Sequence, residues 1–218
     1  VVVSVDGSSV VKKYFEHPLL AEHGHKIKWI VSVTVSPEVY TQARKNNIPV
    51  YWFNPMFDDW RQNESWTRLQ VLMTRTDKYT RGIPRAMSGG CAGNCAWIMA
   101  MEIFKRSPIA LVGMDAGYPE GTKLEDTQYY SSVLKIAEGN IAKIKEAYKE
   151  FYHPVFKTKA YVDLVFYHYR QALCEMQSQT PSWYRLFEGT INATGGGTLF
   201  GQGIKCIAFK DFLMEHPT

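Results

Sequence analysis

The chain has 218 residues, of which 45% are hydrophobic and 21% charged, so it is large enough to bury a full core as an ordinary globular protein. Its net charge of +4 favours phosphates and other anions, but it is too small and too scattered to indicate a nucleic-acid partner. No apolar run reaches the length of a transmembrane helix and no signal peptide is recognisable. We therefore expect a cytoplasmic protein without a membrane partner.

Apolar runs alternate with helix signals over the first half of the chain. Ser36 and Pro37 favour a helix start, because Ser is a good N-cap and Pro suits the first helical position. The predicted strands cover residues 1–5, 28–33, 49–53, 68–74 and 108–115. The predicted helices between them cover residues 10–22, 37–46 and 95–105.

After Gly121 the pattern becomes helical. Two long helices are predicted at residues 125–152 and 158–179, and they are separated near Pro154. A short strand at residues 183–188 and a short helix at residues 208–215 follow. We expect the two long helices to form an arm that covers the sheet or provides the surface of a homodimer.

Strands that alternate with helices favour a parallel sheet covered by helices. No repeat, low-complexity tract or linker divides the chain. The prediction is therefore one α/β domain over residues 1–218, with a mostly parallel sheet and a C-terminal helical arm. Because the chain begins on Val1 rather than Met, we expect this domain to be a trimmed or partial chain.

Cysteine and histidine do not indicate a metal site. Cys91 and Cys95 lack the paired close spacing of zinc ligands, and the four Cys of the chain are too few for a disulfide framework at this length. The six His form no cluster, and no Ser-His-Asp or Cys-His arrangement can be inferred. We expect reduced thiols.

Candidate binding segments follow the predicted strands, because open α/β sheets bind ligands at the carboxyl ends of their strands. This rule selects Asp6, Gly7 and Ser8 after the first strand, and Asn54 after the third. It also selects two Gly-rich turns, SGGCAGN at residues 88–94 and GMDAGY at residues 113–118.

The SGGCAGN turn precedes a predicted helix. Its glycines let backbone N–H groups approach a ligand, and a helix N-terminus attracts a phosphate or a carboxylate. The spacing matches neither the dinucleotide fingerprint nor a P-loop, so an anion site and a closely packed structural turn both stay open. The candidate ligand-binding residues of this turn are Ser88, Gly89, Gly90, Gly93 and Asn94.

Asp115 ends the most apolar of the predicted strands. A carboxylate there can hold a divalent metal or accept a hydrogen bond from a sugar hydroxyl, and an Asp that caps the next turn is the alternative. The NATGGG turn at residues 192–197 fits either close approach to a ligand or a mobile loop. The further candidates in these two turns are Gly117, Tyr118, Asn192, Thr194, Gly195 and Gly196.

Basic and aromatic side chains lie between the third strand and the SGGCAGN turn. Arg75, Lys78, Arg81 and Arg85 can neutralise phosphate charge or form a solvated surface. The aromatic side chains that flank Asn54 can stack on a base or pack in the core. They are Trp52, Phe53, Phe57, Trp60 and Trp66.

One segment resembles the MptE-like family, namely residues 88–118, SGGCAGNCAWIMAMEIFKRSPIALVGMDAGY. Members of that family show a Gly-rich turn, a helix, and a strand that ends in G-x-D and an aromatic residue. NATGGGTLFGQGI, within residues 188–204, is similar to the second signature of that family, an Asn-x-Thr-x-Gly-Gly turn. The resemblance implies a Rossmann-like sheet and a nucleotide-bearing donor.

The family has two branches. One contains archaeal diphosphokinases that move a diphosphate from ATP to 6-hydroxymethyl-7,8-dihydropterin with magnesium, and the other contains sialyltransferase-like motility accessory factors. The diphosphokinase branch carries acidic residues in its Gly-rich turn and a His-rich segment after the third strand. This chain has neutral Cys91, Ala92 and Asn94 in the turn and YWFNP at residues 51–55, which resembles the motility-factor branch more closely.

The resemblance therefore implies a glycosyltransferase-like transferase with a nucleotide or nucleotide-sugar donor. In such an enzyme the SGGCAGN turn holds the donor phosphate, Asp115 is the catalytic residue or a metal ligand, and the NATGGG turn closes over the donor. Two alternatives stay open. They are the ATP-dependent diphosphokinase, which implies Mg²⁺, and a non-catalytic nucleotide- or sugar-binding module.

Overall fold

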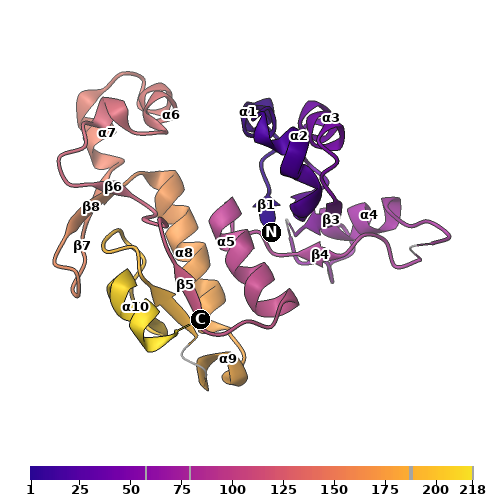
Figure 1. The fold of residues 1–218 in the computed structure, drawn as a ribbon. Helices are drawn as coiled ribbons and strands as arrows, with labels where there is room; N and C mark the ends of the chain where they lie inside the picture. The colour runs from indigo at the N-terminus through magenta and orange to yellow at the C-terminus, as the bar shows by residue number, and fades with distance from the viewer. Residues whose placement is uncertain (57, 79, 187–188, 218) are drawn as a thin grey trace. The chain divides into compact units, whose positions relative to one another are not determined.

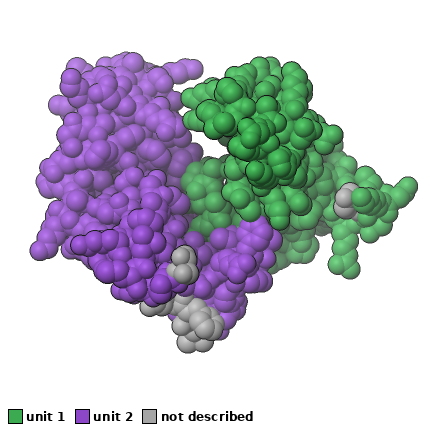
Figure 2. All heavy atoms as spheres, in the orientation of Figure 1, with its two compact units in different colours: residues 1–99 green, residues 100–218 purple. Residues whose placement is uncertain are grey.

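A computed structural model divides the chain into two compact units, Val1–Met99 and Ala100–Thr218 (Figure 2). The structure describes residues 1–56, 58–78, 80–186 and 189–217. Each unit combines parallel strands with helices, which confirms the predicted mixed α/β class. That the whole chain forms one domain stays a prediction.

Unit 1, Val1–Met99, contains a four-stranded parallel sheet in the order β1-β2-β3-β4 (Figure 1). β1 (Val2–Ser4), β2 (Trp29–Ser32) and β3 (Val50–Pro55) confirm three predicted strands. β4 (Arg85–Ala86) is a short edge strand in the basic stretch before the SGGCAGN turn, where no strand is predicted. Because all four strands are parallel, their carboxyl ends lie at one edge of the sheet.

Apolar side chains cover both faces of this sheet. On one face Trp29 and Val31 pack with Val39 of α3 (Pro37–Lys45), the helix predicted to start at Pro37. On the other face Phe53 packs with Cys95 of α5 (Ala92–Ile98), which continues into the π-helix Met99–Ile103. Successive residues of a strand point to opposite faces, and the two clusters follow from that alternation.

The helix predicted at residues 10–22 is interrupted. A 3₁₀ turn (Ser9–Val11) and α1 (Lys12–Phe15) are followed by a break, and α2 (Leu19–His23) begins after Pro18, with a second 3₁₀ turn at Gly24–Lys26. Pro18 lacks a backbone N–H and so cannot continue α1, but it is tolerated at the start of α2.

The strand predicted at residues 68–74 is wrong, because this segment is α4 (Trp66–Met73). Ser65 Oγ accepts a hydrogen bond from the Arg68 N–H at 3.0 Å, and the Asp58 carboxylate accepts from the Trp66 N–H at 2.6 Å. These caps satisfy N–H groups that a helix start leaves without partners. A short apolar run fits a helix as well as a strand, and the caps decide between them.

Unit 2, Ala100–Thr218, has a second parallel sheet in the order β10-β9-β5. Its strands are β5 (Ile109–Leu111), β9 (Thr190–Asn192) and β10 (Ile204–Cys206). The strand predicted at residues 108–115 is thus confirmed over three residues only. Val112 is 54% exposed, so the apolar run is not covered along its whole length.

Of the two long helices predicted in the second half, the first is wrong over much of its length and the second is confirmed from Leu164 to Ser178. The first is replaced by α6 (Tyr130–Ile136), α7 (Ile141–Glu146) and β7 (Lys149–Tyr152), because Gly139 with a φ of 74° ends the helical path. The second is confirmed as α8 (Leu164–Ser178), and the residues before α8 form the strand β8 (Lys159–Val162) instead.

β8 is the middle strand of an antiparallel sheet with β7 and β6 (Tyr118–Pro119). Part of the region predicted as a helical arm is therefore a sheet, and the arm and the homodimer through it stay predictions. A 3₁₀ turn (Leu124–Asp126) precedes α6.

Near the C-terminus, α9 (Ser182–Leu186) is helical where a strand is predicted at residues 183–188, of which the last two lie outside the described residues. Pro181 precedes α9, and its carbonyl accepts the Tyr184 N–H at 3.1 Å. The final predicted helix is confirmed as α10 (Phe209–Glu215). Among the described residues, no helix has both the length and the apolar character needed to cross a membrane.

Candidate functional site

The GMDAGY and NATGGG turns of unit 2 leave neighbouring strands at the same edge. β5 pairs with β9 in parallel, with Leu111 opposite Asn192. The GMDAGY turn begins two residues after Leu111, and the NATGGG turn begins at Asn192 itself, so both lie at the carboxyl ends of their strands. The structure thus brings together two segments that are about 80 residues apart in the chain, at the position where parallel sheets bind ligands.

Hydrogen bonds join the two turns. The Thr198 N–H donates to the Asp115 carbonyl at 2.8 Å, and Thr198 Oγ1 donates to the Ala116 carbonyl at 2.8 Å. Thr194 Oγ1 donates to the Leu111 carbonyl and accepts from the Met114 N–H, both at 3.3 Å. The two turns therefore form one hydrogen-bonded structure rather than two independent loops.

Asn192 and Thr194 hold the NATGGG turn from inside. Asn192 is fully buried, its Nδ2 donates to the Leu199 carbonyl at 2.8 Å, and its Oδ1 accepts from the Thr194 N–H at 2.9 Å. Their polar side-chain atoms are thus engaged in the fold. The exposed groups of this turn are backbone groups around Gly195.

Asp115 is the exposed carboxylate beside the NATGGG turn. Partial desolvation by the surrounding protein raises the pKa of Asp115 above its ordinary value. Among the described residues, no group of three His, Cys, Asp or Glu side chains is arranged to hold a metal ion. The arrangement therefore presents a single carboxylate that can accept a hydrogen bond or a proton.

Gly117 and Tyr118 connect this edge to the antiparallel sheet and to α8. A Cβ on Gly117 would lie 2.9 Å from the Tyr161 carbonyl oxygen, so the backbone segments around Gly117 and Tyr161 approach each other closely. The Tyr118 hydroxyl donates to Asp163 Oδ2 at 2.7 Å, while Asp163 Oδ1 accepts the Val165 N–H at 2.9 Å and caps α8. Burial and then the Asp163 carboxylate raise the pKa of Tyr118, so this hydroxyl stays protonated.

Sequence reasoning missed two residues that support the site. Asp163 stands directly before an apolar helical run, and this N-cap signal was available in the sequence. Arg170 Nε donates to the Thr198 carbonyl at 2.8 Å, and its guanidinium lies over the rings of Phe151 and Phe200. No local sequence signal indicates the role of Arg170, because the residues that it contacts are distant in the chain.

In unit 1, Asp6, Gly7 and Ser8 form an exposed turn after β1. Asp6 Oδ1 accepts the Ser8 N–H at 2.7 Å, and Ser8 Oγ accepts the Val10 N–H at 3.2 Å. A Cβ on Gly7 would lie 2.8 Å from the Thr34 carbonyl oxygen. These side chains therefore stabilise a turn and the helical turn after it.

The SGGCAGN turn is closely packed. Gly89 and Gly90 have φ values of 57° and 83°, and the buried Asn94 donates from Nδ2 to the Gly89 carbonyl at 2.7 Å. Burial raises the pKa of Cys91, and it raises the pKa of Cys95 to about 12, so both thiols are protonated at neutral pH. This geometry favours the structural interpretation of the turn, while Ser88 and the helical Gly93 stay candidates by position.

Asn54 is fully buried at the end of β3. Its Nδ2 donates to Thr74 Oγ1 and to the Ile83 carbonyl, both at 3.2 Å. Thr74 Oγ1 also accepts the Ile83 N–H at 3.1 Å. Asn54 therefore joins the end of α4 to the segment that leads into β4, rather than facing solvent.

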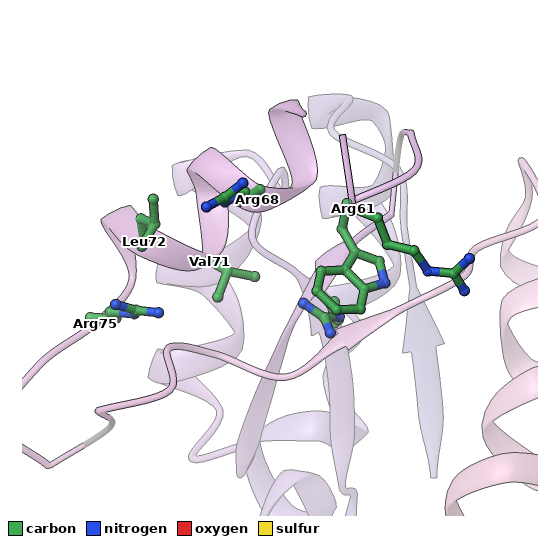
Figure 3. Close-up of a pocket in the computed structure, with 7 residues that line it drawn as sticks. Arg61, Arg68, Val71, Leu72 and Arg75 are labelled. Carbon is green, nitrogen blue, oxygen red and sulfur yellow. The ribbon is translucent and has the colours of Figure 1, made fainter. Parts of the chain in front are cut away.

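A pocket of about 450 Å³ lies beside α4 and β4 in unit 1 (Figure 3). The Arg85 guanidinium lies 3.9 Å from the centre of the Trp60 ring. Of the basic stretch and the aromatic group predicted from the sequence, Arg75, Arg85 and Trp60 line this pocket, and Phe57 lies outside the described residues. The full lining is Trp60, Arg61, Arg68, Val71, Leu72, Arg75 and Arg85.

Compared with models of protein families, with curated proteins and with solved structures, the chain matches none of them. The resemblance to the MptE-like family therefore stays a prediction from two motifs. The structure itself defines a mixed α/β protein with two candidate regions, the joined turns of unit 2 and the arginine-lined pocket of unit 1.

Proposed function

We propose that the chain is a glycosyltransferase-like transferase that uses a nucleotide-activated donor, as the MptE-like resemblance implies. One observation supports this proposal above others, namely that the GMDAGY and NATGGG turns meet at the carboxyl ends of neighbouring parallel strands. The proposal includes the finer fold assignment, in which the parallel sheet of unit 1 is Rossmann-like.

In the proposed reaction, Asp115 accepts the proton of an acceptor hydroxyl. The hydroxyl oxygen forms a bond to the anomeric carbon of the donor sugar, and the bond from that carbon to the phosphate breaks. The nucleoside phosphate leaves with the bonding electrons. A raised pKa suits this role, because a general base works best when its pKa approaches the operating pH.

A second candidate is a non-catalytic binding module for a nucleotide or a sugar. The side chains of Asn192 and Thr194 form hydrogen bonds within the protein, so they are engaged in the fold. Asp115 is then the exposed acidic side chain of the joined turns, and a site with so few reactive groups suits binding without catalysis. The magnesium-dependent diphosphokinase is the alternative that the resemblance leaves open, and no contact among the described residues favours it.

A thermal-shift panel of CMP, CMP-sugars, UDP-sugars and ATP, with and without Mg²⁺, tests the proposal. A ligand at about 100 times its Kd stabilises the folded state by roughly 2.7 kcal/mol. The release of free nucleoside phosphate from the stabilising donor is then followed by chromatography. We expect stabilisation by a nucleotide-sugar together with slow release of the nucleoside phosphate.

Asp115→Asn should leave the melting temperature of the free protein unchanged and slow the release about 100-fold or more, because it removes the general base. Asp126→Asn, a change of the same kind in the Leu124–Asp126 turn of unit 2, is the matched control. Binding without release would favour the non-catalytic module. A response to ATP with Mg²⁺ alone, or to no nucleotide, would contradict the transferase.

A further inference from the structure

We propose that the arginine-lined pocket of unit 1 binds a small phosphorylated ligand that carries a flat ring, with nucleoside diphosphates as the model class. The pocket lies wholly within Val1–Met99. The proposal does not depend on the transfer chemistry assigned to Asp115, which belongs to unit 2.

The charge of the pocket points to an anion. Four of its seven lining residues are arginines, and none is acidic. Arg61 has a distant partner in Asp59, at 3.9 Å. The other three, Arg68, Arg75 and Arg85, form no ion pair within the part of the chain that the structure describes. Arginine side chains gathered without counter-charges match the oxygens of a phosphate, which they bind in a bidentate manner.

The remaining lining residues point to a ring. Trp60 stays 38% exposed although the Arg85 guanidinium stacks on its ring at 3.9 Å. Val71 and Leu72 add an apolar wall from α4 (Figure 3). A flat ring can stack on Trp60 while the arginines hold the phosphates, a combination that the bases and phosphates of nucleotides satisfy.

The wall of the pocket formed by α4 is held in place at both of its ends before any ligand binds. At the start of α4, Asp58 Oδ1 accepts from the Ser65 hydroxyl at 2.6 Å and Ser65 Oγ caps the helix. At its end, Thr74 Oγ1 donates to the Val71 carbonyl at 3.2 Å and accepts from Asn54, which ties α4 to the segment before β4. A preformed site loses less conformational entropy on binding.

The size of the pocket favours a small molecule over a nucleic-acid strand. A volume of about 450 Å³ lies within the range of small-molecule sites, which is roughly 300–1,000 Å³. A single strand needs a basic groove that follows its backbone over several nucleotides. The arginines here surround one pocket instead.

Isothermal titration calorimetry on the full chain tests this proposal, with ADP, pyrophosphate and adenosine as probes at low and moderate salt. We expect ADP to bind more tightly than pyrophosphate, and adenosine most weakly. The affinity for ADP should fall as salt rises, because the interaction is between charges.

The test variant is Arg68→Gln with Arg75→Gln. It should weaken ADP binding by about tenfold or more for each arginine that is replaced, since the loss of each guanidinium removes a charged hydrogen bond to phosphate. Arg44→Gln with Lys45→Gln, on the exposed last turn of α3, removes the same charge outside the pocket and should leave the affinity unchanged. All four side chains are exposed, so we expect both variants to fold, which circular dichroism checks.

Trp60→Leu separates the ring from the phosphates. It should weaken ADP binding about fivefold or more and leave pyrophosphate binding unchanged, because stacking contributes only where a base is present. The proposal is overturned if ADP does not bind, or if both double variants lose the same affinity for ADP. It is also overturned if a single-stranded oligonucleotide binds and ADP does not. Asp115→Asn should keep full ADP binding in this pocket. A failure of the transferase proposal can therefore be told apart from a failure of this one.

Discussion

Gly195 and Gly197 belong to the same turn but have different surroundings. Both have positive φ values, 87° and 74°, which favour glycine. A Cβ on Gly195 would meet nothing within 4 Å, whereas a Cβ on Gly197 would lie 2.5 Å from the Asp115 carbonyl oxygen. Only Gly197 is therefore required by close packing of the two turns.

We expect Gly197→Ala to lower the free energy of unfolding by about 3 kcal/mol or more, because steric overlap adds to the backbone strain. Gly195→Ala is the matched control and should cost about 1 kcal/mol, from the backbone strain alone. Urea unfolding followed by circular dichroism measures both. Equal losses in the two variants would show that the turns do not pack as described.

Three asparagines were selected from the sequence as ligand contacts, and all three brace the protein backbone. Asn54 bonds to the Ile83 carbonyl, Asn94 to the Gly89 carbonyl, and Asn192 to the Leu199 carbonyl. Sequence position places an Asn near a strand end. It does not show whether the amide faces solvent or the chain, because turns at strand ends need such braces themselves.

At the scale of elements, α4 shows how a cap outweighs an apolar pattern. Asp58 Oδ1 accepts from the Ser65 hydroxyl and from the Thr67 N–H, and Oδ2 accepts from the Trp66 N–H. These hydrogen bonds, first among them the one from Ser65, lower the pKa of Asp58 to about 2. The ionised carboxylate also interacts favourably with the helix N-terminus.

The Asp58 cap predicts a pH dependence. Its folded-state pKa, about 2, lies below the ordinary value of 3.8, so the stabilisation is complete above about pH 4 and is lost as the pH falls toward 2. We expect Asp58→Asn to flatten the decrease in the urea midpoint between pH 4 and pH 2. Asp59→Asn, in the same loop, should keep the wild-type slope, since Asp59 Oδ1 accepts the nearby Arg61 N–H at 3.1 Å and lies 3.9 Å from Arg61 Nε, contacts that involve no helix start. The same slope in both variants would contradict the assignment.

At the scale of the whole molecule, the chain passes from unit 1 to unit 2 inside a helical segment. α5 ends at Ile98 and the π-helix Met99–Ile103 follows directly. Trp97, Met99 and Met101 are 1%, 4% and 2% exposed. Proteases cut most readily in exposed segments, whereas these three side chains are buried.

We therefore expect the native protein to resist chymotrypsin at Trp97, Met99 and Met101, while the exposed Trp60 is cut early. Mass spectrometry of the fragments over time checks this order, and the protein in urea, where all sites are accessible, provides the control. Early fragments that end at Trp97 would contradict the burial of this helical segment.

Local sequence signals were enough to predict the α/β class, the first three strands of unit 1, α3 and α10. Each of these elements has a local signal, such as the β-branched run of β1 or the Pro37 start of α3. Where local signals conflict or are weak, as in α4, β7 and β8, the prediction was wrong. The sequence also placed Arg75, Arg85 and Trp60 in one basic and aromatic region, but not in one pocket.

Which segments meet could not be predicted from local signals and becomes visible in the folded chain. The pairing of β5 with β9 joins Asp115 to the NATGGG turn, and the position of α4 brings Arg68 into the pocket with Arg85. These contacts link residues that are far apart in the chain, and they depend on strand order and helix placement. The physical reason is that local backbone preferences determine an element, whereas burial and hydrogen bonding between distant segments determine its neighbours.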